Sequence, residues 1–346
     1  MLRQVCDGQL AAGIHPSIYA CRAGEPDSGQ TFLREEIPLY DSGCRQLRSP
    51  KQVMQLARHL RQHKYDIVHA HLFPAQLWAA IAALVAGNVC PIVTTEHSTW
   101  NRRRKPIFRI FDQWMYRHFR GVVCISEAVE TSLKNWIGSN VCEFYVVNNG
   151  VDLSRFGGVP KHLEGNPKEL TILSVGNLRS VKDHATLLRA LARLKFGKLL
   201  IAGDGELRDS LQRLAVALEI SERVQFLGRR DDVPELMASA DVYVQPSRVE
   251  GFGLAPLEAM AAGLPVITSD AAGMKEMVEG AGLTFPVGNA DALTDLLGEV
   301  LSNAQYRARL SEASLKRASL FSIDKTVEGY QAVYDTVLSR VSQAGS

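Results

Sequence analysis

The sequence predicts an α/β protein made of two successive halves, each built around a parallel sheet. Short runs rich in β-branched residues alternate with amphipathic helical segments, a pattern typical of strand–helix–strand units. The alternation stops in a Gly- and Pro-containing stretch from Asn148 to Lys168 and then restarts. The 346 residues, 46% apolar and 22% charged, suffice for two hydrophobic cores and exclude a disordered chain.

The first half opens with a helical pattern. Leu2, Val5, Cys6 and Leu10 follow helical spacing, and Gly13 is a plausible stop. Strands are then expected at Ile67–His69, Pro91–Thr94, Val122–Ile125 and Tyr145–Val147. A doubly wound half normally places its first strand before its first helix, near the middle of the sheet. We therefore expect a strand to be missing from the start of the chain.

The second half predicts five strands and a long final helix. The strands are expected at Leu170–Val175, Lys198–Ala202, Val224–Leu227, Val242–Gln245 and Pro265–Thr268. In the tail, Val327, Tyr330, Val333, Tyr334 and Val337 follow the 3.6-residue period of a helix that buries one face.

Composition and charge exclude several classes of protein. No apolar run approaches the eighteen residues of a membrane span, and no secretory leader pattern is found, so we expect a cytoplasmic protein. The six cysteines form no Cys-x-x-Cys pair, which favours buried thiols over metal sites or disulfides. Residues 1–160 carry 18 Lys and Arg against 13 Asp and Glu, but the net charge is only +2. We therefore expect no nucleic-acid partner.

The most informative segment is the run Glu250-Gly251-Phe252-Gly253-Leu254-Ala255-Pro256-Leu257-Glu258, between a strand and a helix. Glycines let a ligand approach the backbone, and the amides at a helix start bind anions such as a diphosphate. Glu250 and Glu258 can accept hydrogen bonds from sugar hydroxyls. Two Glu eight residues apart also occur on solvated helix faces, so the specificity lies in the whole run.

This run resembles the Glu-x7-Glu signature of the retaining, nucleotide-sugar-dependent glycosyltransferases of GT-B fold (family 4, or group 1). The resemblance extends from about Lys64 to Val337, with further motifs in the family's order. These are Asn149-Gly150-Val151-Asp152 followed by Phe156, Gly176-x-x-Arg179-x-x-Lys182, Ala202-Gly203-Asp204-Gly205-Glu206 and Phe226-Leu227-Gly228. The family's opening strand and Gly-Gly loop are absent before Leu2, so we expect that the true start lies upstream, with a truncated chain as the alternative.

The resemblance implies the fold and the reaction. The fold would be two Rossmann-like doubly wound domains facing across a cleft: 1–152 on the acceptor side, 153–321 for the donor, and a helix over 322–346 packing back on the first domain. The reaction would be retaining, metal-independent transfer of a hexose from a UDP- or GDP-sugar to a saccharide or lipid-linked saccharide, in bacterial envelope polysaccharide synthesis. Two alternatives stay open: a nucleotide-sugar epimerase of the same fold, and a truncated, weakly active or silent sugar-nucleotide-binding protein.

The resemblance also implies the roles of individual residues. His97 and Glu250 would be catalytic, with His97 supporting an oxocarbenium-like centre and Glu250 holding the donor sugar. The donor-binding residues would be Gly176, Arg179, Lys182, Arg230, Gly251, Phe252, Gly253, Leu254 and Glu258. The sequence itself places Arg179 and Lys182 just beyond a strand end, where open α/β sheets bind ligands, and two cations there suit a diphosphate.

We expect neither a metal nor a cofactor. The chain contains no Asp-x-Asp, the triplet through which the other major glycosyltransferase fold anchors its metal, so Arg179 and Lys182 would take the place of the cation. His69 and His71 are a candidate ligand pair, but no third ligand follows at zinc-like spacing, and structural histidines are the preferred interpretation.

A basic, aromatic segment runs from Trp100 to Arg120. Its seven Arg and Lys stand against the single acid Asp112, with six aromatic residues between them. Such a helix suits an anionic membrane surface or a phosphate-linked lipid acceptor. The alternative is that Phe108, Phe111 and Met115 lie in the core while the arginines face solvent. The sequence leaves both interpretations open.

Overall fold

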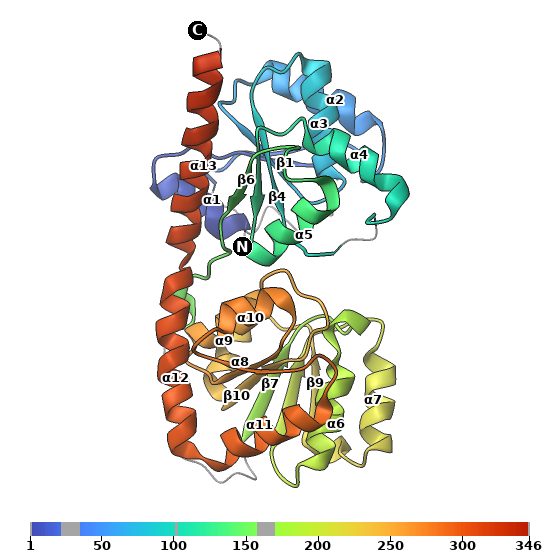
Figure 1. Cartoon of the computed structure of the whole chain (residues 1–346), viewed down its shortest axis with the longest axis vertical. Coiled ribbons are helices and arrows are strands. Elements are labelled where there is room, and N and C mark those ends of the chain that lie inside the picture. The colour runs from blue at the N-terminus through green and yellow to red at the C-terminus, as the bar shows by residue number, and fades with distance from the viewer. Residues whose placement is uncertain (1, 22–34, 101–102, 158–169, 345–346) are drawn as a thin grey trace. The chain divides into compact units, whose positions relative to one another are not determined.

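The computed structural model describes residues 2–21, 35–100, 103–157 and 170–344, which fall into two compact units (Figure 1). The first unit comprises Met1–Gly150 and Ile323–Ser346, and the second comprises Val151–Ser322. Arg102 of the basic segment and residues 158–168 of the loop-like stretch lie outside the described residues.

The first unit is an α/β structure with parallel strands. Its helices are α1 (Leu2–Ala11), α2 (Lys51–Gln62), α3 (Ala75–Ala86), α4 (Pro106–Tyr116), α5 (Glu127–Ile137) and α13 (Ile323–Ala344). Its strands are β1 (Ile18–Ala20), β2 (Leu39–Asp41), β3 (Val68–His71), β4 (Ile92–Glu96), β5 (Gly121–Cys124) and β6 (Phe144–Val146). The four predicted strands form the sheet β3-β4-β5-β6, while β1 and β2 pair separately. The prediction missed β1 and β2, because three residues are too few to show a period.

The two ends of this unit's sequence pack on each other. The described part begins with α1, as predicted, and Gly13 follows that helix at a φ of +80°. Helix α13 lies beside α1 (Figure 1). A Cβ on Gly8 would lie 2.7 Å from Val327, so only glycine permits this approach. All five predicted apolar positions of α13 are buried, and four of them share a core with Val5, Val93, Val123 and Val147.

The second unit has a six-stranded sheet with helices on both faces. Its strands are β7 (Thr171–Val175), β8 (Lys198–Ala202), β9 (Val224–Gly228), β10 (Val242–Gln245), β11 (Val266–Ser269) and β12 (Leu283–Phe285). Its α-helices are α6 (His184–Arg193), α7 (Arg208–Ala217), α8 (Val233–Ser239), α9 (Leu254–Ala261), α10 (Ala272–Val278), α11 (Ala290–Ser302) and α12 (Ala304–Ala318). Short 3-10 helices are η2 (Leu153–Arg155), η3 (Ser180–Lys182), η4 (Ser221–Arg223) and η5 (Ser319–Phe321).

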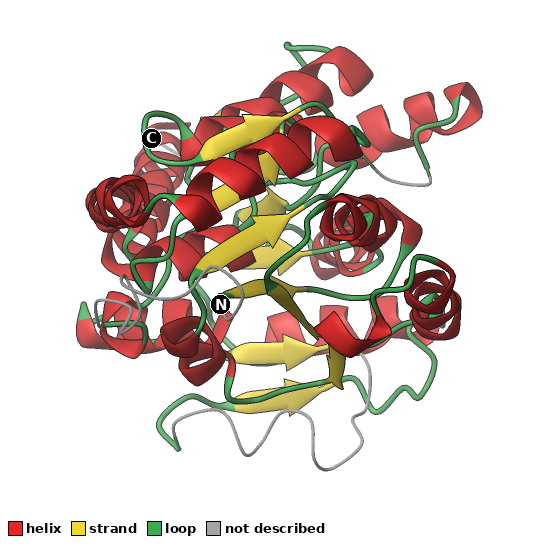
Figure 2. Ribbon diagram, turned by 90° about the horizontal axis from the view of Figure 1, so that it is seen from below, coloured by secondary structure: helices red, strands yellow, loops and turns green. Residues whose placement is uncertain are grey.

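The strand order of this sheet fixes where a ligand would sit. The order is β12-β11-β10-β7-β8-β9, and every pair is parallel (Figure 2). From β7 the chain builds the sheet in one direction, and from β10 it builds in the other. Open α/β sheets bind ligands at such a switch point, outside the carboxyl ends of the strands. The loops after β7 and β10 are therefore the place to look.

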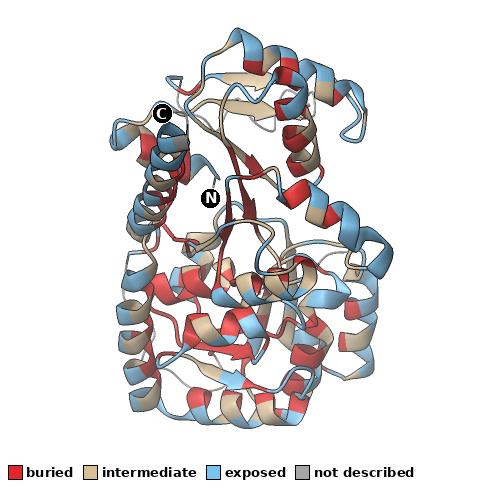
Figure 3. Ribbon diagram, turned by 45° about the horizontal axis from the view of Figure 1, so that its top comes forward, coloured by how far each residue is buried: buried red, intermediate tan, exposed pale blue. Residues whose placement is uncertain are grey.

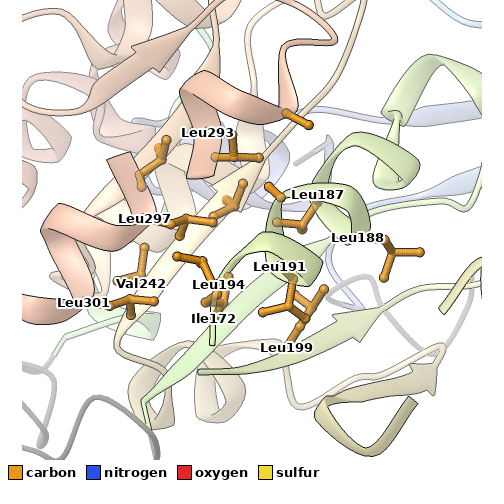
Figure 4. Close-up of a cluster of buried hydrophobic side chains, with 14 of the residues drawn as sticks. Ile172, Leu187, Leu188, Leu191, Leu194, Leu199, Val242, Leu293, Leu297 and Leu301 are labelled. Carbon is orange, nitrogen blue, oxygen red and sulfur yellow. The ribbon is translucent and has the colours of Figure 1, made fainter. Parts of the chain in front are cut away.

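A leucine-rich core holds this sheet against α6 and α11 (Figure 4). Ile172 and Val242 from the sheet meet Leu187 of α6 and Leu293 and Leu297 of α11, all fully buried. Burying one such side chain stabilises a fold by about 1.5–3 kcal/mol. Strands β10 and β11 are buried along their whole length. Figure 3 colours buried residues red, and these residues are concentrated on the strands and on the inner faces of the helices. Parallel strands that are covered on both faces consist of continuous apolar runs, and such runs can be recognised in the sequence.

Candidate active site

The loops at the switch point bring together Lys182 and Glu250. Lys182 ends η3 after β7, Glu250 follows β10, and these strands are hydrogen-bonded neighbours. The Lys182 Nζ lies 2.5 Å from Glu250 Oε2, with side chains that are 24% and 21% exposed. A Cβ on Gly176 would lie 3.8 Å from Cδ of Lys182, so the lysine stem lies against the backbone at Gly176. Three of the predicted site residues therefore meet here.

A row of buried hydrogen bonds continues from β10 to Glu250. The Tyr243 hydroxyl donates to Gln245 Oε1 at 2.6 Å, and Gln245 Nε2 donates to Ser247 Oγ at 2.8 Å. Ser247 Oγ in turn donates to Glu250 Oε2 at 3.5 Å. Burial raises the pKa of Tyr243, so its phenol stays protonated as a donor. These residues were not predicted, although polar side chains at every second position of a buried strand are a recognisable pattern.

A second contact fastens the turn after β7 to the loop after β10. The Arg248 amide donates to the Val181 carbonyl at 2.8 Å, and Arg248 Nη2 lies 2.9 Å from Asp183 Oδ2. Asp183 is buried, has a φ of +49° and accepts a hydrogen bond from Thr186. Asp183 and Arg248 were not predicted, because the ion pair between them joins residues 65 positions apart.

The Glu250–Glu258 run forms the turn and helix that its glycines predict. Gly253 precedes α9 at a φ of +90°, a backbone conformation that favours glycine. Leu254 begins α9, whose first-turn amides have no partner within the helix itself. Phe252 is 2% exposed and packs edge-on against Phe321 at 5.5 Å between ring centres. The Phe252 side chain therefore packs in the core beneath the Glu250–Glu258 turn and stabilises that turn.

The backbone of this run is also packed tightly from behind. A Cβ on Gly273, in the first turn of α10, would lie 2.3 Å from the Gly251 carbonyl oxygen and 3.0 Å from that of Glu250. Only glycine fits at this position, which was not predicted from the sequence. Glu258 lies on α9, and burial raises the pKa of its carboxyl, while the charge of Arg155 acts against that rise.

The two predicted arginines differ in their setting. Arg179 precedes η3, is exposed, and its carbonyl accepts from the Lys182 amide at 2.9 Å. Arg230 follows β9, which β8 separates from β7 in the sheet. Its Nε donates to Asp232 Oδ1 at 2.7 Å, and its Nη2 bonds the other oxygen of that carboxylate. The structure thus keeps Arg179 beside Lys182 but places Arg230 two strands away.

The first unit assembles a row of three histidines. His69 and His71 share one face of β3, and their rings stack with centres 4.2 Å apart. His71 Nδ1 lies 3.2 Å from Nε2 of His97, which follows β4. Burial lowers the pKa of His71 to about 3 and also lowers that of His97, so both imidazoles are neutral at pH 7.

His69 has partners on both ring nitrogens. Its Nδ1 lies 2.7 Å from the Tyr334 hydroxyl, and its Nε2 lies 2.7 Å from Thr95 Oγ1. In the described part of the chain, no three His, Cys, Asp or Glu side chains are grouped so that they could hold a metal ion.

Helix α4 exposes an apolar stripe. Ile107 is 80% and Ile110 78% exposed, and Phe111 and Trp114 continue the same face at helical spacing. Phe108 is also exposed, whereas Met115 is buried. The alternative that placed Phe108, Phe111 and Met115 in the core therefore holds for Met115 and is wrong for the two phenylalanines, because only the other side of α4 packs inward.

The arginines before α4 have partners of their own. Arg104 donates to the Thr99 carbonyl at 2.7 Å and also bonds Ser132. The Arg103 guanidinium lies 3.6 Å from the centre of the Phe73 ring. Across the described helices, none combines the length and apolarity needed to cross a bilayer.

Two family models match the chain. Residues 1–155 match the model described as Glycosyltransferase Family 4, and residues 160–317 match the model described as Glycosyl transferases group 1.

Known proteins are similar over nearly the whole chain. A UDP-Gal:alpha-D-GlcNAc-diphosphoundecaprenol alpha-1,3-galactosyltransferase of Escherichia coli is 27% identical, covering 91% of this chain and 86% of its own. A phosphatidyl-myo-inositol mannosyltransferase of Mycobacterium leprae is 30% identical, covering 89% and 83%. The crystal structure of HepE of Anabaena in complex with UDP superposes with a TM-score of 0.80 at 23% identity, covering 97% and 96%. This structural likeness shows the fold, two Rossmann-like units of GT-B type.

Proposed function

This chain belongs to the glycosyltransferases of GT-B fold described by the family 4 and group 1 models, and we propose that it transfers a hexose from a UDP- or GDP-sugar to a hydroxyl with retention of configuration. The observation that carries this proposal is the Lys182–Glu250 pair at the switch point of the second sheet. The pair places a cation that would bind the donor's diphosphate next to a carboxylate that would accept hydrogen bonds from the sugar's hydroxyls.

The donor would lie along the loops after β7 and β10. Arg179 and Lys182 would bind the diphosphate, and the backbone of Gly176 would allow it to approach closely. The amides from Gly251 to Leu254 would meet sugar and phosphate, Glu258 would bind the ribose, and the backbone near Arg230 would face the nucleobase.

The chemistry we propose needs no nucleophile from the protein. The acceptor hydroxyl attacks the anomeric carbon on the face that the diphosphate leaves, so a carbon–oxygen bond forms as the sugar–diphosphate bond breaks. The acceptor's proton passes to an oxygen of the leaving diphosphate. Arg179 and Lys182 stabilise the charge that grows there, Glu250 holds the sugar, and His97 supports the oxocarbenium-like carbon through a hydrogen bond.

We propose that transfer proceeds without a metal. Arg179 and Lys182 lie in the turn after β7, and their two positive charges can neutralise a diphosphate as a divalent cation would. Turnover that persists undiminished in EDTA would support this, and turnover restored only by a divalent cation would refute it.

For the acceptor we propose a hydroxyl of a lipid-linked saccharide or of a lipid headgroup in a bacterial envelope. The E. coli and M. leprae relatives are named for acceptors of these kinds, a GlcNAc-diphosphoundecaprenol and a phosphatidyl-myo-inositol. HepE, in turn, binds UDP, which supports a nucleotide-sugar donor.

The exposed stripe of α4 fits this proposal as a peripheral membrane contact. Ile107, Ile110, Phe111 and Trp114 would enter the acyl boundary, and Arg109, exposed on the same helix, would face anionic headgroups. The cytoplasmic leaflet carries such headgroups, so we place the protein on that face of the inner membrane.

A donor panel tests the proposal. UDP- and GDP-sugars are incubated with the purified chain, and nucleotide release is followed for the wild type, Lys182→Ala and Glu250→Ala. Selective release of UDP or GDP, lost in both variants, is expected. Conversion of a sugar nucleotide to its epimer would indicate the epimerase instead. Binding without turnover, even with acceptor present, would indicate the silent binding protein.

A further inference from the structure

His71 and His97 come from neighbouring strands at the ligand-facing ends of the first sheet. In the register of β3 and β4, His71 lies opposite Thr95, and His97 follows two residues later. Their rings are tilted by 40° with centres 5.5 Å apart, and Nδ1 of His71 lies 3.2 Å from Nε2 of His97. The Nε2 of His97 is therefore engaged inside the protein, and Nδ1 is its remaining ring nitrogen.

The hydrogen bond between the two rings couples the proton position on His97 to the proton position on His71. Burial keeps both imidazoles neutral at pH 7, so one nitrogen of the pair donates and the other accepts. If His71 donates, His97 carries its proton on Nδ1 and offers a donor to the ligand. If His71 accepts, Nδ1 of His97 offers an acceptor. In a neutral imidazole, the bond made by one nitrogen fixes the role of the other.

His71 is itself held in place. The ring of His69 stacks on it at 4.2 Å, and His69 is bonded through both nitrogens to Tyr334 of α13 and Thr95 of β4. A ring supported in this way has little freedom to turn. The orientation of His97 thus depends on a fixed neighbour.

We propose that His71 is a positioning residue for His97. Its Nδ1 bond to His97 Nε2 fixes the ring orientation of His97 and ties the tautomer of His97 to that of His71, so that Nδ1 of His97 faces the substrate. This inference rests on the proposed function, in which His97 meets the donor sugar.

The test compares three substitutions of His71. Asn places a polar amide atom close to the position of Nδ1, Gln places it one bond further out, and Leu removes it. We expect His71→Leu and His71→Gln to lower kcat for nucleotide release by about 10- to 100-fold with little change in KM, because a small misplacement of a reacting group is costly. His71→Asn should recover most of the wild-type rate.

A double substitution separates positioning from a merely structural role. In a His97→Asn background, His71→Leu should lower the rate by less than about 2-fold, because the residue that it positions is gone. An equal loss in both backgrounds would overturn the proposal, as would a His71→Leu enzyme with the wild-type kcat.

A second readout does not depend on turnover. Long-range ¹⁵N–¹H spectra of the histidine rings should show a single tautomer of His97 in the wild type and in His71→Asn, and a mixture in His71→Leu. An unchanged His97 signal in His71→Leu would refute the positioning role. If instead no sugar nucleotide is consumed by the wild type while this spectral change occurs, the proposed function fails and the positioning of His97 stands.

Discussion

The ammonium of Lys182 and the carboxylate of Glu250 form an ion pair across the switch point of the second sheet, with 2.5 Å between Nζ and Oε2. Each of the two charges is neutralised by the other. A diphosphate that binds Lys182 must compete with Glu250 for the ammonium. In the function that we propose, the pair would therefore link nucleotide binding to the position of the carboxylate.

Substitutions of the two partners should affect nucleotide binding differently. Lys182→Ala removes a charged hydrogen-bond donor, and we expect the Kd for UDP or GDP to rise at least about 10-fold. Glu250→Gln releases Lys182 from its partner, so the Kd should stay the same or fall, although turnover is lost. Titration calorimetry measures both, with the exposed Lys195→Ala as the control. Equal weakening by Lys182→Ala and Glu250→Gln would contradict this account.

Gly273 should be intolerant of a single added methyl group. Its Cβ would lie 2.3 Å from the Gly251 carbonyl oxygen, so Gly273→Ala must displace the backbone of the Glu250 loop or α10. Overpacking of this kind costs about 1–3 kcal/mol, and we expect a lower urea midpoint together with slower nucleotide release.

Gly298→Ala is the matched control for that substitution. In α11 the added Cβ would make an ordinary contact, 3.8 Å from Leu194, and alanine is the better helix former by roughly 1 kcal/mol. Stability should therefore stay the same or rise. A Gly273→Ala protein as stable and active as Gly298→Ala would show that the loop has room to move.

The buried imidazole of His184 should make the protein less stable in acid. Neither ring nitrogen finds a hydrogen-bond partner among the described residues, and burial lowers its pKa to about 4, with a smaller contribution from the charge of Lys182. In the unfolded chain His184 binds a proton below pH 6.5, whereas in the folded chain it binds that proton only near pH 4. The free energy of unfolding therefore falls across that window and is unaffected above it.

The size of this effect can be measured with His184→Leu. Between pH 7 and pH 5 the wild type should lose about 2 kcal/mol more than the variant in urea titrations followed by circular dichroism. An equal loss in both proteins would mean that His184 is already charged, or bonded, in the folded state.

The stripe on α4 should bind lipid vesicles. We expect the wild type to bind vesicles containing phosphatidylglycerol more strongly than neutral ones, with binding weakened by salt. The double substitution Ile107→Ser and Ile110→Ser should lower the partition coefficient at least about 10-fold in vesicle sedimentation, because it removes two apolar side chains from the contact.

Val216→Ser is the control for this experiment. Val216 is 66% exposed on α7, in the second unit, and its loss should leave vesicle binding unchanged. A similar loss in both variants, or no binding by the wild type, would contradict a membrane contact through α4.

The sequence predicted much of the fold because its long strands are buried on both faces. The runs at β7, β8 and β10 matched the predicted ranges within a residue, since continuous apolar stretches identify such strands. The short strands β1, β2 and β12 were missed, because three residues carry too little pattern.

The candidate site was predicted only as far as local motifs reach. The run from Glu250 to Glu258 and the turn containing Lys182 were readable as motifs, but the bond between them depends on the order of β7 and β10 in the sheet. Contacts between distant positions, such as Arg248 with Asp183, leave no local pattern. Nor does sequence alone show that His71 bonds His97.

The most direct test of the central claim is the anomeric configuration of the sugar that the enzyme releases. An α-linked UDP- or GDP-hexose is incubated with the purified chain. Proton NMR records the anomeric configuration of the released sugar before the sugar mutarotates. The account predicts the α anomer, at a rate that falls with Lys182→Ala and Glu250→Ala. Release of the β anomer, or a rate unaffected by both substitutions, would contradict it.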